Sequence, residues 1–150
     1  MYHFNFESLL NYRRYQEEIL QKELADFKNQ LIQHERLLHQ MKQDRRKYSR
    51  ELHQLQKRGG TVSGLIIYFR YLNRLAVDID NQNHSVAKAK KQFDRKRREL
   101  IEIVKKRNTL EKLKDKGFLT YQREMLRKEQ RLMDEVAATR YNGKRRDTQR

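Results

Sequence analysis

Two histidines and one glycine-rich segment are the places in this sequence where residue type and spacing suggest chemistry. In HERLLH, His34 and His39 lie five residues apart. The zinc-protease motif HExxH needs a spacing of four, because only then do both imidazoles share one face of a helix. A spacing of five turns the two side chains about 140° apart. A shared zinc ion is therefore not expected. We interpret the pair as one histidine on the apolar stripe where two helices pack together, which we call the seam, and one histidine on the surface.

The glycine-rich segment RGGTVSG, residues 58–64, does not predict nucleotide binding. A phosphate-binding loop ends in GK[ST], and this ending is missing here. The chain has no Cys, which removes thiol catalysis, thiolate metal ligands and disulfides. The sequence contains no recognisable arrangement of Ser, His and an acidic residue of the kind that forms a catalytic triad. We expect a protein that is not an enzyme and that has no cofactor, no catalytic residues and no metal site.

The composition indicates long, exposed helices. The 150 residues include no Pro and five Gly, so little interrupts a helix. Charged residues make up 37% of the chain and hydrophobic residues 36%, which suits helices with a narrow apolar seam better than a globular core. The net charge of +16 favours acidic partners such as nucleic acid, anionic lipid or an acidic protein surface.

The amino terminus, MYHFNFESLLNYRR, lacks the apolar run of a signal peptide. The longest uninterrupted apolar run, Leu65–Phe69, is far too short to span a membrane. We expect a soluble, cytoplasmic protein.

The apolar residues form two heptad seams. Steps of four and three over residues 6–55 reach apolar side chains at eleven of fifteen positions, and the same stepping over residues 65–114 gives a seam of similar quality. Between the seams, the glycines can reverse the chain, and Thr61 or Ser63 can cap the second helix.

The expected fold class is all-α, a long antiparallel two-helix coiled-coil hairpin whose C-terminal helix overhangs the N-terminus. All fifteen positions of one seam meet a position of the other when facing residue numbers add to 120. The expected single domain has a helix at 4–57, a turn at 58–64, a helix at 65–140 and a basic flexible tail at 141–150. A parallel homodimer is the rival arrangement, and glycines in mid-chain disfavour it.

In this register residue 4 meets residue 116, so the chain after Gly117 overhangs the start of the first helix. The overhang carries an apolar stripe at helical spacing, formed by Phe118, Tyr121, Met125, Leu132 and Val136. No part of the same chain is left to cover this stripe, and we expect another molecule to do so. Gly117 is expected to form a joint, because glycine weakens a helix.

Two other segments suggest binding. Lys88–Arg98 holds seven basic residues against one Asp and is either a solvated helix face or an anion-binding stripe. GLIIYFRYL, residues 64–72, holds more apolar side chains than one seam can bury, which predicts packing on the other helix or docking of a partner. Two functions of such a chain stay open: a basic coiled-coil nucleic-acid-binding protein and a self-associating filament or homodimer.

Three motifs occur in a fixed order: FNFESLLNYR at the start, YFRYLNRLAVDIDNQ after the glycines, and LEKLKDKGFLTYQREMLRKEQRLMDEVAATR near the end. In these motifs, in their order and in its length, the chain resembles the FliJ family, whose members are small coiled-coil components of the bacterial flagellar type III export apparatus. The resemblance covers most of residues 4–140. The last motif is the most specific, because Glu129-Gln130 and Asp134-Glu135 match the EQ and DE pairs of the family.

The resemblance implies a non-enzymatic stalk at the cytoplasmic face of the flagellar base. Such a protein inserts the open end of its hairpin into the hexameric ring of the export ATPase. It also contacts the cytoplasmic domain of the membrane export gate and binds export chaperones. Its association with the membrane apparatus would be peripheral, through these partners, and no specific nucleic acid is expected.

The resemblance also implies which residues bind. The ATPase-ring-binding residues would be Phe118, Tyr121, Met125, Lys128, Glu129, Gln130, Leu132, Asp134, Glu135 and Val136. The gate-binding residues would be Leu37, Met41, Tyr48, Tyr71 and Leu75. At two further places of the gate-binding patch this chain has Asp44 and Asp78, where the family is expected to have aromatic or small residues.

Overall fold

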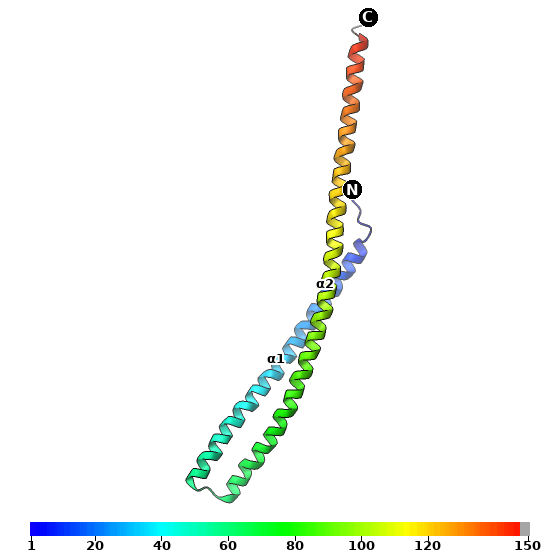
Figure 1. Ribbon diagram of the computed structural model, residues 1–150. Coiled ribbons are helices and arrows are strands. Elements are labelled where there is room, and N and C mark those ends of the chain that lie inside the picture. The colour runs from blue at the N-terminus through cyan, green and yellow to red at the C-terminus, as the bar shows by residue number, and fades with distance from the viewer. Residues whose placement is uncertain (148–150) are drawn as a thin grey trace. The chain divides into compact units, whose positions relative to one another are not determined.

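The computed structural model describes residues 1–147 of the chain, and side chains as far as residue 145. It contains two α-helices, α1 (Glu7–Arg58) and α2 (Val62–Asp147), which pack against each other as a helical hairpin (Figure 1). The predicted fold class is therefore confirmed. The chain forms two compact units, one of Gln16–Ile103 and the other of Met1–Tyr15 together with Val104–Arg150.

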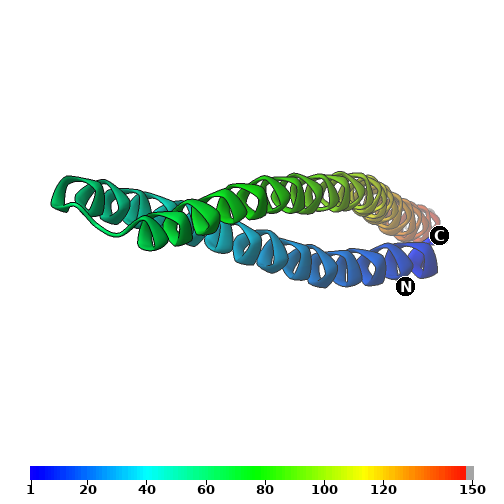
Figure 2. The same ribbon diagram turned by 90° about the horizontal axis from the view of Figure 1, so that it is seen from below.

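The turn between the helices uses its glycines in two different ways. Gly59 has a φ of 74°, the left-handed conformation that commonly ends a helix. The next amide, that of Gly60, donates a hydrogen bond to the carbonyl oxygen of Leu55 at 3.0 Å. A Cβ at Gly60 would lie 2.5 Å from Leu55 Cγ, so no larger residue fits there without a shift. Figure 2 shows this short connection at one end of the hairpin.

Thr61 caps α2 at its first turn. Its hydroxyl oxygen accepts a hydrogen bond from the Gly64 amide at 3.3 Å, and its carbonyl accepts one from the Leu65 amide at 3.1 Å. This is the pattern of an N-cap residue. Of the two caps expected, Thr61 is the one used, and α2 begins at Val62 instead of Leu65.

In the unit Gln16–Ile103, two contacts between α1 and α2 lie within one residue of the predicted register, in which facing residue numbers add to 120. Lys96 forms an ion pair with Glu23, with its Nζ 2.9 Å from the carboxylate, and 23 and 96 add to 119. The rings of Tyr48 and Tyr71 lie 4.8 Å apart, and these numbers also add to 119. The buried apolar side chains of this unit are those of Leu52, Leu75, Ile79 and Ala89.

One polar pair sits inside this seam. Gln82 is only 8% exposed, and its Nε2 donates a hydrogen bond to the carbonyl oxygen of His34 at 2.9 Å. The same nitrogen lies 3.2 Å from His34 Nδ1. These contacts satisfy a buried amide that would otherwise be costly. His34 is half-buried and His39 is exposed, as expected of one seam and one surface histidine.

In the other unit, α1 begins at Glu7 and not at residue 4. The Leu10 amide closes the first turn by bonding to the carbonyl oxygen of Phe6 at 2.9 Å, and the preceding residues are not helical. They pack instead: Phe4 is buried, and the Tyr2 ring lies 5.7 Å from that of Phe118. We call residues 1–6 the N-terminal strap.

Two expectations about α2 are wrong. Gly117 is not a joint, because α2 runs through it without a break; a Cβ there would lie 3.2 Å from Tyr2 Cζ, so the small residue admits the tyrosine. The second helix does not end at residue 140 but continues to Asp147, since residues 141–147 contain no Pro and one glycine alone costs a helix about 1 kcal/mol. The rest of the predicted tail, 148–150, lies outside the described residues.

Candidate binding surfaces

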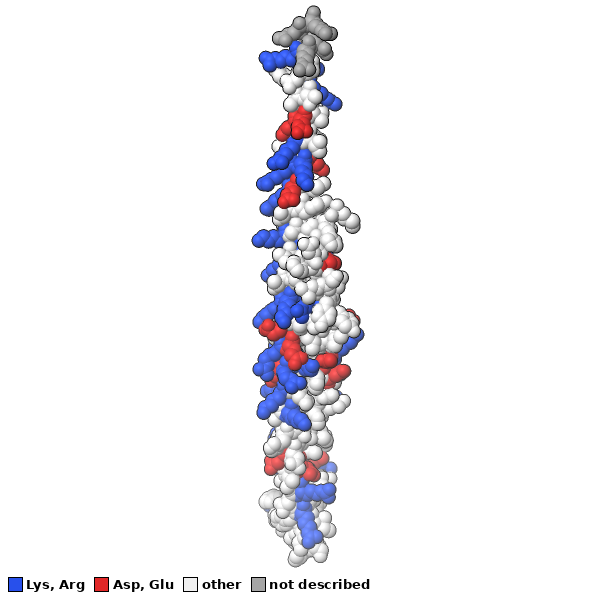
Figure 3. Space-filling view, turned by 90° about the vertical axis from the view of Figure 1, so that its right-hand side faces the viewer, with Lys and Arg blue, Asp and Glu red and all other residues white. Residues whose placement is uncertain are grey.

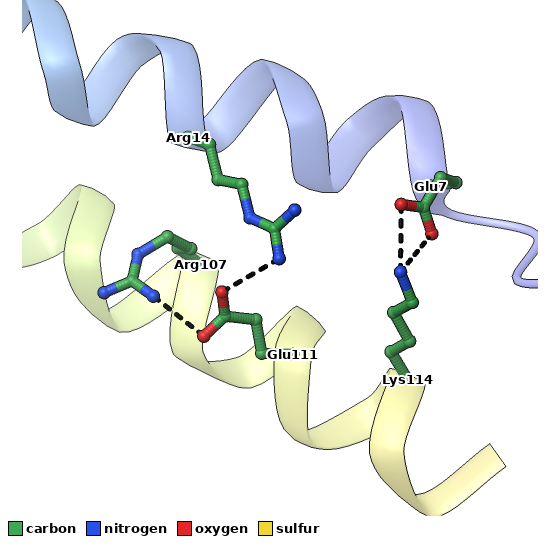
Figure 4. A network of polar contacts seen from close by, with 5 residues as sticks. All are labelled: Glu7, Arg14, Arg107, Glu111 and Lys114. Carbon is green, nitrogen blue, oxygen red and sulfur yellow. Dashed lines mark hydrogen bonds and ion pairs between the residues drawn. The ribbon is translucent and has the colours of Figure 1, made fainter. Parts of the chain in front are cut away.

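A polar network fixes α1 against α2 near the N-terminal strap (Figure 4). Glu111 accepts hydrogen bonds from Arg107 at 2.7 Å and from Arg14 at 3.2 Å. Lys114 forms an ion pair with Glu7 at 2.8 Å. Partial burial works to raise the pKa of Glu111, but the hydrogen bonds from Arg107 and Arg14 outweigh it, and the pKa lies below its ordinary value.

Beyond this network, α2 carries a long stretch of exposed residues. Every residue from Gln122 to Arg145 is exposed, and we call this stretch the exposed segment. Its apolar side chains include three of the predicted stripe: Met125, Leu132 and Val136. The exposed segment begins five residues after Gly117 because the N-terminal strap reaches further than expected.

The first two residues of the predicted stripe belong to the strap contact. The Tyr2 ring packs on Phe118 and on Tyr121, with ring centroids 5.7 Å apart in both cases. The amino group of Met1 donates a hydrogen bond to the Tyr121 hydroxyl oxygen at 3.1 Å. Tyr121 is half-buried, whereas Phe118 keeps 43% of its surface exposed. The stripe is therefore partly covered by its own chain at this end.

A second apolar stripe was missed in the sequence. Leu119, Leu126 and Met133 are all exposed, Met133 by 74%, and they follow one another at exactly seven residues. On a helix this row lies about 100° from the row of Met125 and Leu132. The seven-residue spacing was the signal that could have revealed it. Leu132, Met133, Val136, Ala137 and Arg140 line a shallow surface hollow of about 420 Å³ between the two rows.

The polar residues of the predicted ATPase-binding set surround the helix. Lys128, Glu129, Gln130, Asp134 and Glu135 are all exposed. Helical geometry places Glu129 between the two apolar stripes, about 40° from Met125, and Asp134 on the opposite side, about 180° from Met125. The set is thus brought together along one segment but does not form one face.

The predicted gate-binding residues lie in the unit Gln16–Ile103 at different depths. Leu37 and Tyr71 are exposed, Met41 and Tyr48 are half-buried, and Leu75 is 7% exposed and belongs to the core. A shallow hollow of about 340 Å³ is lined by Ile67 and three tyrosines, Tyr48, Tyr68 and Tyr71. Tyr68 donates a hydrogen bond to Glu51 at 3.2 Å, and this bond raises the pKa of the phenol.

The basic stretch Lys88–Arg98 keeps most of its charges at the surface. Six of its seven basic side chains are exposed, namely Lys88, Lys90, Lys91, Arg95, Arg97 and Arg98. Lys96 is the half-buried one, and its hydrogen bond to Glu23 is the main reason that its pKa is raised. Ala89 and Phe93 carry the seam beneath the stretch. Both interpretations, solvated face and anion-binding stripe, are compatible with this arrangement.

Within residues 1–147, neither helix contains an apolar stretch long enough to cross a bilayer. In the same part of the chain, no three side chains of the metal-ligating acidic and histidine types lie close enough together to hold a metal ion.

Comparison with protein families gives one match. The model of the family described as flagellar FliJ protein matches residues 2–146, nearly the whole chain. Neither curated protein sequences nor solved structures give a match for this chain. A helical hairpin with the expected motifs and a family match over this length lead to one conclusion: the chain belongs to the FliJ family, whose members are non-catalytic components of the flagellar protein export apparatus.

Proposed function

We propose that this protein is the coupling stalk of the export apparatus, at the cytoplasmic face of the flagellar base. In this proposal the exposed segment enters the hexameric ring of the export ATPase. The observation that carries the proposal is the exposure of every residue from Gln122 to Arg145, although the segment bears two rows of apolar side chains. An isolated helix of this kind is marginal in water, and a partner that covers it would stabilise it.

The distribution of side chains around the exposed segment supports a partner that encircles it. Apolar side chains occupy two rows, and the polar residues of the predicted set lie between the rows and on the far side of the helix. A groove would cover one face only, whereas the channel of a ring meets all faces. A single helix is about 10–12 Å wide. The channel is expected to offer apolar contacts for Met125 and Leu132 and a cationic group for Glu129.

The second part of the proposal is that the protein also binds the export gate and export chaperones. The cytoplasmic domain of the gate would bind at Leu37 and Tyr71, which are exposed on the unit Gln16–Ile103, and at the half-buried Met41 and Tyr48. Leu75 would support this surface from the core and would not touch the gate. Helices resist compression along their axis, which suits a protein that links the ATPase to the gate.

The ATPase contact is tested with the double variant Met125→Asp, Leu132→Asp. Both side chains are exposed in the free protein, so helicity by circular dichroism is expected to stay unchanged. The variant loses the favourable burial of two apolar side chains in the channel, and the two carboxylates that replace them are costly to desolvate. Co-purification with the export ATPase is therefore expected to fall at least tenfold.

A matched control places the same charges elsewhere on α2. Val77 and Ile101 are also exposed, and the variant Val77→Asp, Ile101→Asp changes the net charge equally. It is expected to co-purify with the ATPase like the wild type. Full ATPase binding by the Met125, Leu132 variant would refute this assignment of the site.

A further inference from the structure

The end of the hairpin next to the turn combines basic and apolar surface with almost no acidic residue. We call residues 45–77 the hairpin tip. It contains eight Lys or Arg residues and one acidic residue, Glu51, and from residue 52 to 77 there is no Asp or Glu at all. In Figure 3 the end of the molecule that holds the turn shows blue and white atoms, with red atoms only further along the helices. An unbalanced positive charge is thus concentrated at the tip.

The apolar part of the tip is a stripe outside the seam. Val62, Ile66, Phe69 and Val77 are all exposed, Val62 by 72%. At about 100° per residue these four side chains fall within roughly 80° of one another on α2. The buried seam residues Leu75 and Ile79 point to another side of the helix, so this stripe is extra apolar surface that the hairpin itself does not cover.

Basic side chains are exposed at the tip on both helices. Arg70 and Arg74 are exposed, and Arg70 lies only about 20° beyond the edge of the stripe around α2. On α1, Arg45, Arg46 and Arg50 line a surface hollow of about 520 Å³ together with Ser49. The aliphatic part of an arginine side chain can pack along apolar neighbours while its guanidinium group stays in a polar environment, such as near the phosphate groups of a ligand.

We propose that the hairpin tip docks on the surface of an anionic lipid bilayer. Val62, Ile66 and Phe69 enter the headgroup region, and the surrounding Arg side chains contact lipid phosphates. Amphipathic helices with aliphatic and aromatic side chains beside basic ones bind such interfaces without crossing the membrane. The stripe and the Arg side chains beside it include none of the residues that are proposed to bind the ATPase or the export gate, so each proposal can fail without the other.

The charge of the tip decides between the possible occupants. A second copy of this chain would bring the same basic residues to the contact, and like charges repel. Nucleic acid would satisfy the charge, but Val and Ile have no aromatic face on which bases stack, which would leave most of the stripe in water. An anionic bilayer satisfies both the charge and the aliphatic side chains.

The test is co-sedimentation of the full chain with lipid vesicles. The protein is expected to bind vesicles of equal parts phosphatidylglycerol and phosphatidylcholine and not to bind phosphatidylcholine alone. The variant Val62→Ser, Ile66→Ser, Phe69→Ser is expected to lower partition at least tenfold. The control Tyr15→Ser, Ile101→Ser, Leu113→Ser removes one aromatic and two aliphatic side chains of similar exposure and is expected to leave partition unchanged.

A second pair of variants tests the charge. Arg70→Gln, Arg74→Gln is expected to lower partition roughly tenfold, since each basic residue at an anionic surface adds severalfold to binding. Arg36→Gln, Arg123→Gln, on two exposed arginines outside the tip, reduces the net charge equally and is expected to have little effect. All variants should retain wild-type helicity by circular dichroism. Equal binding to neutral vesicles, equal losses in tip and control variants, or binding of duplex DNA through the tip without vesicle binding would each overturn the proposal.

Discussion

At the scale of single residues, the best-defined electrostatic contact is Glu111 between two guanidinium groups. Its carboxylate accepts hydrogen bonds from Arg107 and Arg14, and its folded-state pKa lies below the ordinary value of 4.5. The charged form is therefore preferred in the folded protein. This contribution to stability is present above pH 4.5 and is lost as the pH falls through the lowered pKa.

Glu111→Gln is expected to lower the free energy of unfolding by roughly 1 kcal/mol at pH 7, a modest value because water screens a side chain that is about one-third exposed. The difference from wild type should shrink as the pH falls below 4.5 and through the lowered pKa of Glu111. Urea unfolding at a series of pH values measures it. Asp115→Asn, on an exposed carboxylate of the same helix, serves as the control and should change little. A deficit for Glu111→Gln that stays the same at every pH of the series would contradict the electrostatic origin.

A second prediction concerns Gly117, where the absence of a side chain leaves room for the Tyr2 ring and does not make the helix flexible. Gly117→Ala would gain helix propensity of about 0.8–1 kcal/mol but would displace the Tyr2 ring, which lies directly against it. In the Tyr2→Ala background the collision is absent, and the full gain is expected. Thermal unfolding of the four combinations measures this non-additivity. Equal gains in both backgrounds would show that the strap does not hold Tyr2 against the helix.

At the scale of elements, depth distinguishes the residues of the gate surface. Leu75 is buried in the seam, and Leu75→Ala is expected to cost about 2–5 kcal/mol of stability. Tyr71 is exposed, and Tyr71→Ala should leave the helices intact while lowering the affinity for the cytoplasmic domain of the gate at least tenfold. Chemical denaturation and a binding titration separate the two effects. Reduced gate binding without a loss of stability in Leu75→Ala would contradict its placement in the core.

The sequence was sufficient for the two helices and their register, because a heptad seam has a fixed period and a hairpin needs facing residue numbers with a constant sum. It was insufficient where local and distant contacts compete. Residues 4–6 continue the helical pattern, yet they leave the helix so that Phe4 can be buried. No periodicity encodes the contact of the neighbouring Tyr2 with Phe118, a residue more than a hundred positions away.

The same limit applies to the candidate surfaces. The stripe of Met125, Leu132 and Val136 follows from helical spacing alone, and these side chains are indeed exposed. The coverage of Phe118 and Tyr121 by the strap depends on Tyr2 fitting above Gly117, which only coordinates reveal. The burial of Leu75 could have been foreseen, since it is itself a seam position of the second helix.

At the scale of the whole molecule, the seam of each helix is matched within one chain. The ion pair of Glu23 with Lys96 and the ring contact of Tyr48 with Tyr71 both join α1 to α2 of the same hairpin. A parallel homodimer would require these seams to face a second copy instead. The hairpin therefore has no seam left to offer, and a partner would have to bind exposed apolar side chains outside the seams, such as those of the exposed segment and the hairpin tip.

The purified protein is accordingly expected to be a monomer, with a mass near 18.5 kDa by light scattering at moderate salt. Like charges support this state, because a chain with a net charge of +16 repels its copies at long range. A mass of twice that value would point to self-association. If Met125→Asp, Leu132→Asp then restored the monomer, the exposed segment would be covered by a second copy. Its assignment to the ATPase ring would have to be abandoned, because one helical surface cannot be occupied by both partners at once.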